Sequence, residues 1–287
     1  MRIPSGADAA VVYISGQSNA HAHHQEVPEA ERIAAPLRRV FGLDRRENQR
    51  LDLSRVTWSG YTGRGKNLGE TQDDTACFAY WLARLWERAG DALPPLHIVQ
   101  ISVGSQGLCN GMWNRDLPPR LIPGPLGTAD ISLYPLALRV FGLVRDDLSA
   151  RFRAPAALGW HWIGSEEDAA PDFCGRADLP ERYDAFFDAM RAAIGFPCPT
   201  YLYRLLYAPL SPEYAPGVRA VNAIFERESA RGGGAVRIVG ADEAPFWDEA
   251  DERLGVFSAD GVHYAARTQR WFAERFFRET TGLGPKP

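Results

Sequence analysis

The feature that most constrains the fold is a series of short, nearly continuous apolar runs of β type. They occupy residues 9–15, 96–103, 156–163, 200–206 and 235–240. A strand that is covered on one face alternates apolar and polar residues, whereas a strand buried on both faces is apolar throughout. We therefore expect a parallel sheet with helices on both of its faces.

Segments with helical periodicity lie between and after these runs. They cover residues 75–90, 181–195, 217–234 and 265–282. In the first of them, Phe78, Leu82 and Leu85 fall on one stripe, and Gly90 suits a helix end. Strands that alternate with helices predict the α/β class, here a three-layer α/β/α sandwich with a central parallel sheet.

Two long segments, near residues 42–74 and 104–135, fit neither pattern because they are polar and rich in glycine. Loops of this length are usually functional or disordered. We expect both to leave the sheet at the carboxyl ends of its strands, where parallel α/β folds place their ligand crevice. No stretch resembles a linker, so residues 1–287 are expected to form one domain.

Composition excludes several classes of function. The 287 residues are 45% hydrophobic and carry a formal net charge of −4, as in soluble globular proteins. No Lys/Arg run is present that could neutralise a phosphate backbone, which argues against nucleic acid as a partner. No membrane span and no secretory signal is recognisable. We expect a cytoplasmic protein, with export by a non-classical route left open.

The four cysteines are Cys77, Cys109, Cys174 and Cys198. None belongs to a C-x-x-C pair, so their spacing excludes a zinc ribbon or a redox motif. Free thiols are expected in a cytosolic protein, and a Cys174–Cys198 bridge stays open.

Two short motifs point to nucleophilic catalysis by a serine. A Gly-Gln-Ser-Asn turn, residues 16–19, follows the first apolar run, and Asp260 and His263 precede the last helical segment. A serine hydroxyl becomes a nucleophile when a histidine takes its proton, and a carboxylate orients that histidine. At the start of a helix, Ser18 would also direct its backbone N–H toward an oxyanion. The pattern favours a Ser18–His263–Asp260 triad over a serine that only caps a helix.

These two motifs resemble blocks of the SGNH (GDSL-like) hydrolases, and more narrowly of the sialate O-acetylesterase and plant-type carbohydrate acetylesterase branch. The resemblance implies a flavodoxin-like α/β/α fold, hydrolysis without metal or other cofactor, and O-acetylated sugars as the usual substrates. By position it implies Ser18 as nucleophile, His263 as general base and Asp260 as its orienting carboxylate. Gln17 and Asn19 are expected to support them.

The family's third block, with two glycines and a following tryptophan, matches less well. Gly104 keeps the first glycine, Ser105 replaces the second, and Trp113 lies further along the chain than usual. The resemblance implies an oxyanion donor near Gly104 or Ser105. We also expect Trp113 to contact the substrate, because exposed aromatic rings stack against sugars.

The family's Trp-x-Gln-Gly-Glu-x-Asp block falls on residues 162–168, where Gly164 and Ser165 replace the glutamine and the second glycine. In the family that glutamine donates an amide to the oxyanion, and losing one such donor can cost about 10²–10³-fold in turnover. The candidate replacements are the side-chain amides of Gln106, Asn110 and Asn114. The matching glutamate, Glu166, is expected to support the site by hydrogen bonding.

Three histidines, His21, His23 and His24, follow the serine closely. Imidazole is a common metal ligand, yet no partner motif accompanies this spacing. We therefore predict no metal site and expect His21 to border the mouth of the active site and touch substrate.

The sequence thus predicts a serine esterase that removes short acyl groups, O-acetyl above all, from a carbohydrate. The expected partner is a small-molecule or glycan ester, and nothing indicates an oligomeric state. Two alternatives stay open: a non-catalytic or weakly active carbohydrate-binding descendant, and a metal-dependent hydrolase built on the three histidines. A glycosidase-like pair of Glu166 and Asp168 is conceivable, but we prefer the supporting role of Glu166.

Overall fold

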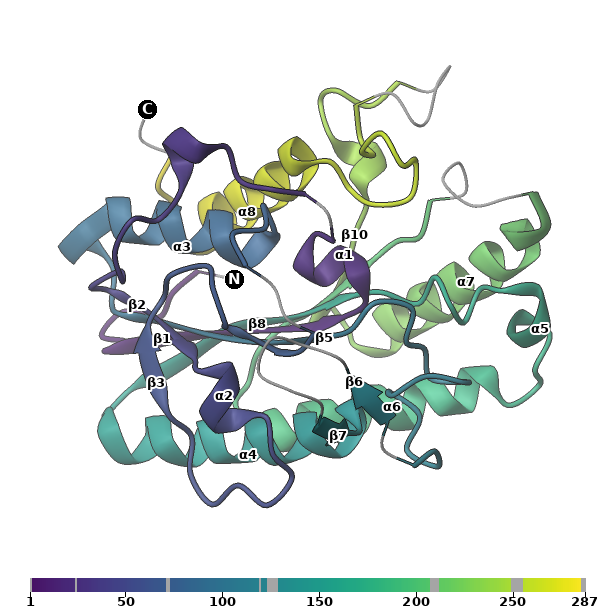
Figure 1. The fold of residues 1–287 in the computed structure, drawn as a ribbon, viewed down its shortest axis with the longest axis horizontal. Coiled ribbons are helices and arrows are strands. Elements are labelled where there is room, and N and C mark those ends of the chain that lie inside the picture. Colours follow the sequence, from purple (N-terminus) through teal and green to yellow (C-terminus); the bar gives the residue numbers. More distant parts are fainter. Residues whose placement is uncertain are drawn as a thin grey trace.

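The structure is a computed structural model that describes residues 2–23, 25–70, 73–118, 120–122, 129–206, 212–248 and 255–284. Its centre is one sheet with helices above and below it (Figure 1). The strands of this sheet are β1 (Ala9–Gly16), β2 (Val40–Leu43), β3 (Trp58–Gly60), β4 (Asn67–Gly69), β5 (Leu96–Ser102), β8 (Pro155–Ile163), β9 (Thr200–Tyr203) and β10 (Val236–Val239). Their order is β10-β9-β8-β1-β5-β2-β3, and β4 pairs with β5.

Among the described residues, the strand pairs of this sheet are parallel apart from β2 and β3. A second, two-stranded sheet joins β6 (Arg120–Ile122) to β7 (Ala129–Ile131). The predicted α/β class with a central parallel sheet is confirmed.

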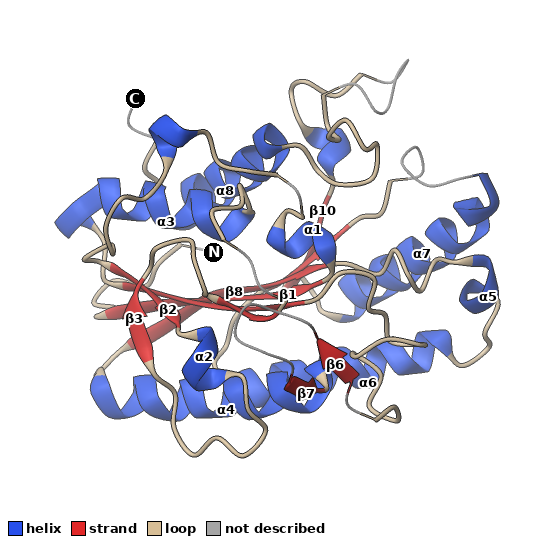
Figure 2. Cartoon of the chain, in the orientation of Figure 1, coloured by secondary structure: helices blue, strands red, loops and turns tan. Residues whose placement is uncertain are grey.

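The longer helices cover the two faces of the sheet (Figure 2). One face packs against α3 (Phe78–Ala89) and α8 (Ala266–Thr281), and the other against α4 (Leu133–Arg151), α6 (Leu179–Ile194) and α7 (Ala215–Arg231). The short helices in the described part of the chain are α1 (Ser18–His21), α2 (Arg45–Asn48) and α5 (Pro171–Cys174). Single 3₁₀ turns cover Glu29–Glu31, Gly90–Ala92, Pro212–Tyr214 and Ala241–Glu243.

The central strand β1 shows why its sequence is apolar throughout. All of its residues are buried. Val11 and Tyr13 belong to the core on the α4 side, where the Tyr13 ring packs 4.9 Å from the ring of Phe141. Val12 and Ile14 belong to the core on the α3 and α8 side. Alternate side chains therefore enter two different cores, as the continuous apolar run predicts.

The five predicted strands and the four predicted helices are present, but the prediction of two long irregular segments is wrong in part. Residues 42–74 include the end of β2, then α2, β3 and β4. These elements are three or four residues long, too short for a periodic pattern. Residues 104–135 include β6, β7 and the start of α4, a helix that the sequence pattern did not predict.

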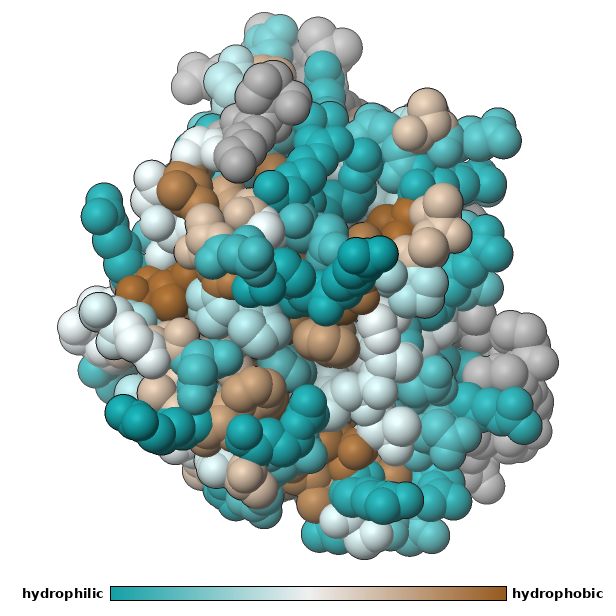
Figure 3. Space-filling model, turned by 90° about the vertical axis from the view of Figure 1, so that its left-hand side faces the viewer, coloured by the Kyte–Doolittle hydropathy of each residue, from teal (hydrophilic) through white to brown (hydrophobic). Residues whose placement is uncertain are grey.

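Surface properties agree with the composition. The side of the molecule in Figure 3 is mainly hydrophilic, and its hydrophobic residues appear in small separate areas. Within the described ranges, no helix is both long and apolar enough to cross a membrane. All four cysteines are free, including Cys174 and Cys198, so the open possibility of a bridge between them is not realised.

Candidate active site

The Gly-Gln-Ser-Asn turn lies at the carboxyl end of β1, where that strand passes directly into α1. Gly16 has a φ of +149°, and a Cβ built on it would lie 1.9 Å from the carbonyl oxygen of Ile163. Only glycine allows β1 and β8 to approach this closely. Ser18 is the first residue of α1 and half-buried, and an N–H at this position has no partner within the helix.

The acid–base pair precedes α8. The Nδ1 atom of His263 lies 2.8 Å from Oδ2 of Asp260. The other carboxylate oxygen accepts hydrogen bonds from Ser258 Oγ and from the backbone N–H groups of Val262 and His263, at 2.6, 2.9 and 2.9 Å. Partial burial opposes ionisation of Asp260, but these hydrogen bonds outweigh it and hold its pKa well below the usual range. The carboxylate is therefore ionised wherever His263 could act as a base.

Asn19 joins the serine turn to the histidine segment across 245 positions of sequence. Its Oδ1 accepts from the backbone N–H of Tyr264 at 2.8 Å, and its carbonyl oxygen accepts from Gln269 Nε2 at 2.7 Å. Neighbours of Ser18 and His263 are thereby fixed to each other. Between these two described side chains the structure shows no direct hydrogen bond, and such contacts in unliganded enzymes often tighten only with substrate.

Glu166, after β8, is held by the same asparagine. Its Oε1 accepts from Asn19 Nδ2 at 2.9 Å, whereas its Oε2 is enclosed with no hydrogen-bond partner among the described residues. Burial raises the pKa of this carboxyl, although the Asn19 hydrogen bond and the nearby His263 oppose the rise. The expected supporting position of Glu166 agrees with these contacts.

We expect Glu166→Gln to change how stability depends on pH. A carboxyl whose pKa is raised in the folded state stabilises the fold in acid, and this contribution is lost as pH rises from its unfolded pKa through the raised value. Near pH 7 the glutamine variant should therefore melt a few degrees above the wild type, and the difference should shrink toward pH 4. Thermal unfolding between pH 4 and 8 measures it. The neighbouring Glu167→Gln is the matched control, and an identical effect there would contradict the assignment.

The two departures from the family pattern after β8 interlock with Gln17. Ser165 has a φ of +101°, which is strained for a non-glycine residue, and its N–H donates to Gln17 Oε1 at 2.6 Å. A Cβ on Gly164 would lie 3.1 Å from both Cγ and the backbone N of Gln17. The Gln17 side chain thus holds the turn after β8 and packs against Gly164, the position that corresponds to the family's glutamine.

Gly104, at the end of β5, adjoins the serine. A Cβ built on it would lie 3.6 Å from Ser18 Cβ. Its backbone N–H donates to Glu70 Oε2 at 2.8 Å. Glu70 could not be predicted at this site from the sequence, because it follows β4, which is too short to be recognised by its pattern.

The amides expected to replace the family's glutamine stabilise their own loop. Gln106 donates to the carbonyl oxygen of Gly104 and accepts from Met112 N–H. Asn110 donates to Glu167 Oε1, and Asn114 donates to the carbonyl oxygen of Cys109. These contacts lie within the loop or join it to the segment after β8. Ser105 is exposed beside Gly104, with a φ of +53°.

Two expected substrate contacts need correction. Trp113 is only 1% exposed, and its Nε1 donates to the carbonyl oxygen of Gly16 at 3.1 Å. Its ring packs edge-on against Trp162 and Phe186. Trp113 therefore stabilises the Gly-Gln-Ser-Asn turn and does not expose its ring for stacking against a sugar. His21 is 2% exposed and contacts Ser102 Oγ at 2.9 Å, so it too is buried. His24 lies outside the described residues.

The surroundings of Asp168 disfavour its role in a glycosidase-like carboxylate pair with Glu166. It is buried and accepts hydrogen bonds from the N–H groups of Leu108 and Cys109 and from the hydroxyl of Tyr183. Burial raises its pKa, although these donors oppose the rise. A Cβ on Gly107 would lie 2.4 Å from its Oδ1. Asp168 therefore anchors the loop after β5 and is not open to a substrate.

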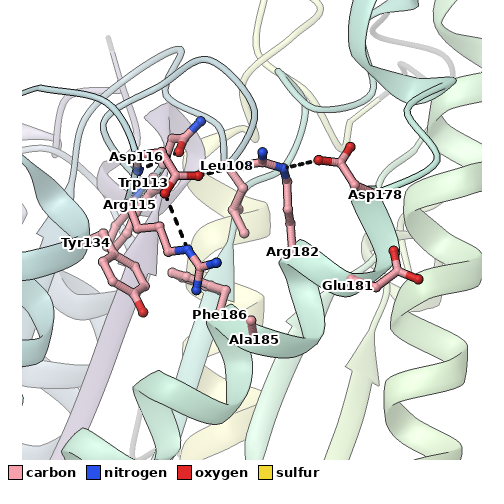
Figure 4. Close-up of a pocket in the computed structure, with 11 residues that line it drawn as sticks. Leu108, Trp113, Arg115, Asp116, Tyr134, Asp178, Glu181, Arg182, Ala185 and Phe186 are labelled. Atoms are coloured by element: carbon pink, nitrogen blue, oxygen red, sulfur yellow. Dashed lines mark hydrogen bonds and ion pairs between the residues drawn. The ribbon is translucent and has the colours of Figure 1, made fainter.

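A pocket of about 210 Å³ lies beside the same loop (Figure 4). Its walls come from Leu108, residues 113–116, Tyr134, and Asp178 with one side of α6, and neither Ser18 nor His263 is among them. Arg182 crosses it, with ion pairs to Asp178 at 2.7 Å and Asp116 at 3.5 Å. This pocket is therefore separate from the candidate triad residues.

Known structures resemble this chain in fold although their sequences differ widely from it. No family model and no curated protein matches the sequence. The structure of NanS aligns with 96% of this chain and 99% of its own, with a TM-score of 0.63 and 17% identity. A protein from Arabidopsis thaliana aligns with 94% and 98%, with a TM-score of 0.54 and 13% identity. The chain shares its fold with these two structures, so the α/β/α fold that the SGNH resemblance implies is confirmed.

Proposed function

We propose that the protein is a serine esterase that hydrolyses short-chain acyl esters, chiefly O-acetyl groups on a carbohydrate. The observation that carries the proposal is the fixed pairing of two motifs at one sheet edge. Asn19, next to Ser18, binds the backbone of Tyr264, next to His263, and His263 is paired with an ionised Asp260. A fold shared with SGNH-type hydrolases supports ester hydrolysis in general.

In the proposed mechanism, Nε2 of His263 takes the proton of Ser18 as its Oγ attacks the ester carbonyl. The imidazolium then protonates the leaving alcohol, and an acyl-enzyme remains. Water attacks this acyl group with His263 again as base, which releases the acid and restores Ser18. Asp260 and the nearby Glu166 stabilise the positive charge that His263 carries in between.

The oxyanion would be held by backbone N–H groups. Ser18 N–H, at the start of α1, is one donor, and Gly104 N–H, beside Ser18, is the second. Because Glu70 already accepts from Gly104 N–H, the substrate has to displace that carboxylate. The proposal therefore includes a site that rearranges locally when an ester binds.

The sugar preference rests on the sequence resemblance to carbohydrate acetylesterases. We further propose that residues 1–287 form one catalytic domain and that the protein is cytoplasmic. The sugar preference is tested with purified protein on p-nitrophenyl acetate, butyrate and octanoate, and on acetylated xylo-oligosaccharides and O-acetylated sialic acid. We expect acetate to be released from an acetylated sugar, rates that fall with acyl length, and fluorophosphonate labelling of the peptide that contains Ser18.

The same assay separates the alternatives. Binding of acetylated glycans with no hydrolysis of any ester would favour a carbohydrate-binding descendant. Hydrolysis that a chelator abolishes, with no labelling of Ser18, would favour a metal-dependent hydrolase.

A further inference from the structure

Two of the histidines that the proposed mechanism leaves without a role meet a carboxylate beside the active site. His21 ends α1, His23 lies in the following turn, and Glu70 follows β4. One ligand atom from each of the three lies within 4.8 Å of the others. His21 Nε2 is 3.4 Å from Glu70 Oε2, and His23 Nδ1 is 3.8 Å from Glu70 Oε1.

These separations suit a small divalent ion. Zinc binds histidine nitrogen and carboxylate oxygen at about 2.0–2.2 Å in tetrahedral geometry, which places its ligand atoms about 3.3–3.5 Å apart. The His21–Glu70 distance is already in this range. The His23–Glu70 distance is measured to the other carboxylate oxygen, so His23 has to move closer to complete the site. His23 can supply that movement because its side chain is one-third exposed.

The buried histidine is oriented as zinc ligands usually are. His21 Nδ1 lies 2.9 Å from Ser102 Oγ, and that hydroxyl donates to Asn67 Oδ1 at 3.0 Å. The Asn67 amide is fixed because its Nδ2 donates to two carbonyl oxygens, those of Glu70 and Ser102. The hydroxyl proton is thus used, so Nδ1 of His21 donates and Nε2 directs its lone pair toward Glu70. A histidine that binds metal commonly donates its other nitrogen in this way.

We propose that His21, His23 and Glu70 bind one divalent transition-metal ion such as Zn²⁺, and that the bound ion inhibits the esterase. The inhibition, but not the binding, rests on the proposed function. The ring of His23 lies 5.2 Å from that of His263, so a dication there opposes the positive charge that His263 must gain. Metal binding would also hold Glu70, which already occupies the N–H of Gly104.

The test uses the whole protein, stripped with a chelator and dialysed. Zinc is titrated by calorimetry, and cobalt(II) is added in parallel to record its d–d absorption. We expect one ion per chain and cobalt bands with the intensity of tetrahedral coordination. His23→Gln should weaken zinc binding by about 100-fold or more and abolish those bands. Glu70→Gln should behave alike, whereas the exposed Glu26→Gln should bind as the wild type does.

Circular dichroism confirms that each variant is folded. Absence of zinc binding to the wild type, or unchanged binding to folded His23→Gln, would overturn the site. Zinc should lower acetate release by the wild type and leave His23→Gln unaffected, and binding without this loss would overturn the inhibition. If no ester is hydrolysed at all, the proposed function fails, while the calorimetric and cobalt measurements still decide the metal site.

Discussion

Replacing Ser18 by alanine should lower kcat on p-nitrophenyl acetate by at least about 10³-fold, with little change in KM. The variant keeps the backbone N–H of residue 18 and the Asp260–His263 pair, so it can still bind and polarise an ester. It lacks the oxygen that forms the acyl-enzyme, and a hydrolysis that passes through that intermediate cannot proceed without it. Initial rates under saturating substrate measure the effect.

The measurement needs a folded variant and a matched serine. Ser18 is half-buried at a helix start where alanine is tolerated, so thermal unfolding should be nearly unchanged. Ser54→Ala, at an exposed serine remote in sequence from both motifs, should keep the wild-type rate. Activity that survives in Ser18→Ala would exclude the serine mechanism, and fluorophosphonate labelling should disappear with the rate.

The sequence predicts the parts of the fold that bury the most apolar surface. The run in β1 is continuous because Val11 and Val12 enter different cores, and that periodicity is visible without a structure. Helix α4 was not predicted because its first residues follow a Pro- and Gly-rich stretch that looks irregular. Strand β4 was not predicted because three residues at a sheet edge show no periodic pattern.

The candidate site, too, contains residues that the sequence predicts and residues that it does not. Ser18, Asp260 and His263 lie in compact motifs whose spacing indicates chemistry, so they could be named from sequence. Glu70 could not, because its place beside Gly104 depends on the pairing of β4 with β5.

The burial of Trp113 could not be predicted from the sequence either. A tryptophan on a loop predicts a surface ring, yet its N–H is needed by the carbonyl oxygen of Gly16. Contacts between segments far apart in sequence decide both residues.

Asp260→Asn should lower kcat by about 10⁴-fold while substrate binding stays close to that of the wild type. The carboxylate accepts from His263 Nδ1–H at 2.8 Å, which leaves Nε2 unprotonated and able to act as a base. The amide oxygen of asparagine can still accept the N–H groups of Val262 and His263. Its NH₂ group then faces Nδ1 and forces the ring proton onto Nε2, where it blocks proton transfer. Asp91→Asn, at a 97% exposed carboxylate, is the control.

Stability provides a second readout that separates this role from misfolding. Because the folded-state pKa of Asp260 lies below its usual value, its contribution to stability is present above about pH 4. It is lost as pH falls toward the folded pKa. The difference in Tm between wild type and Asp260→Asn should therefore be constant from pH 7 to 5 and shrink toward pH 3. A lost rate with a pH-independent Tm difference would mean that Asp260 is not the ionised partner of His263.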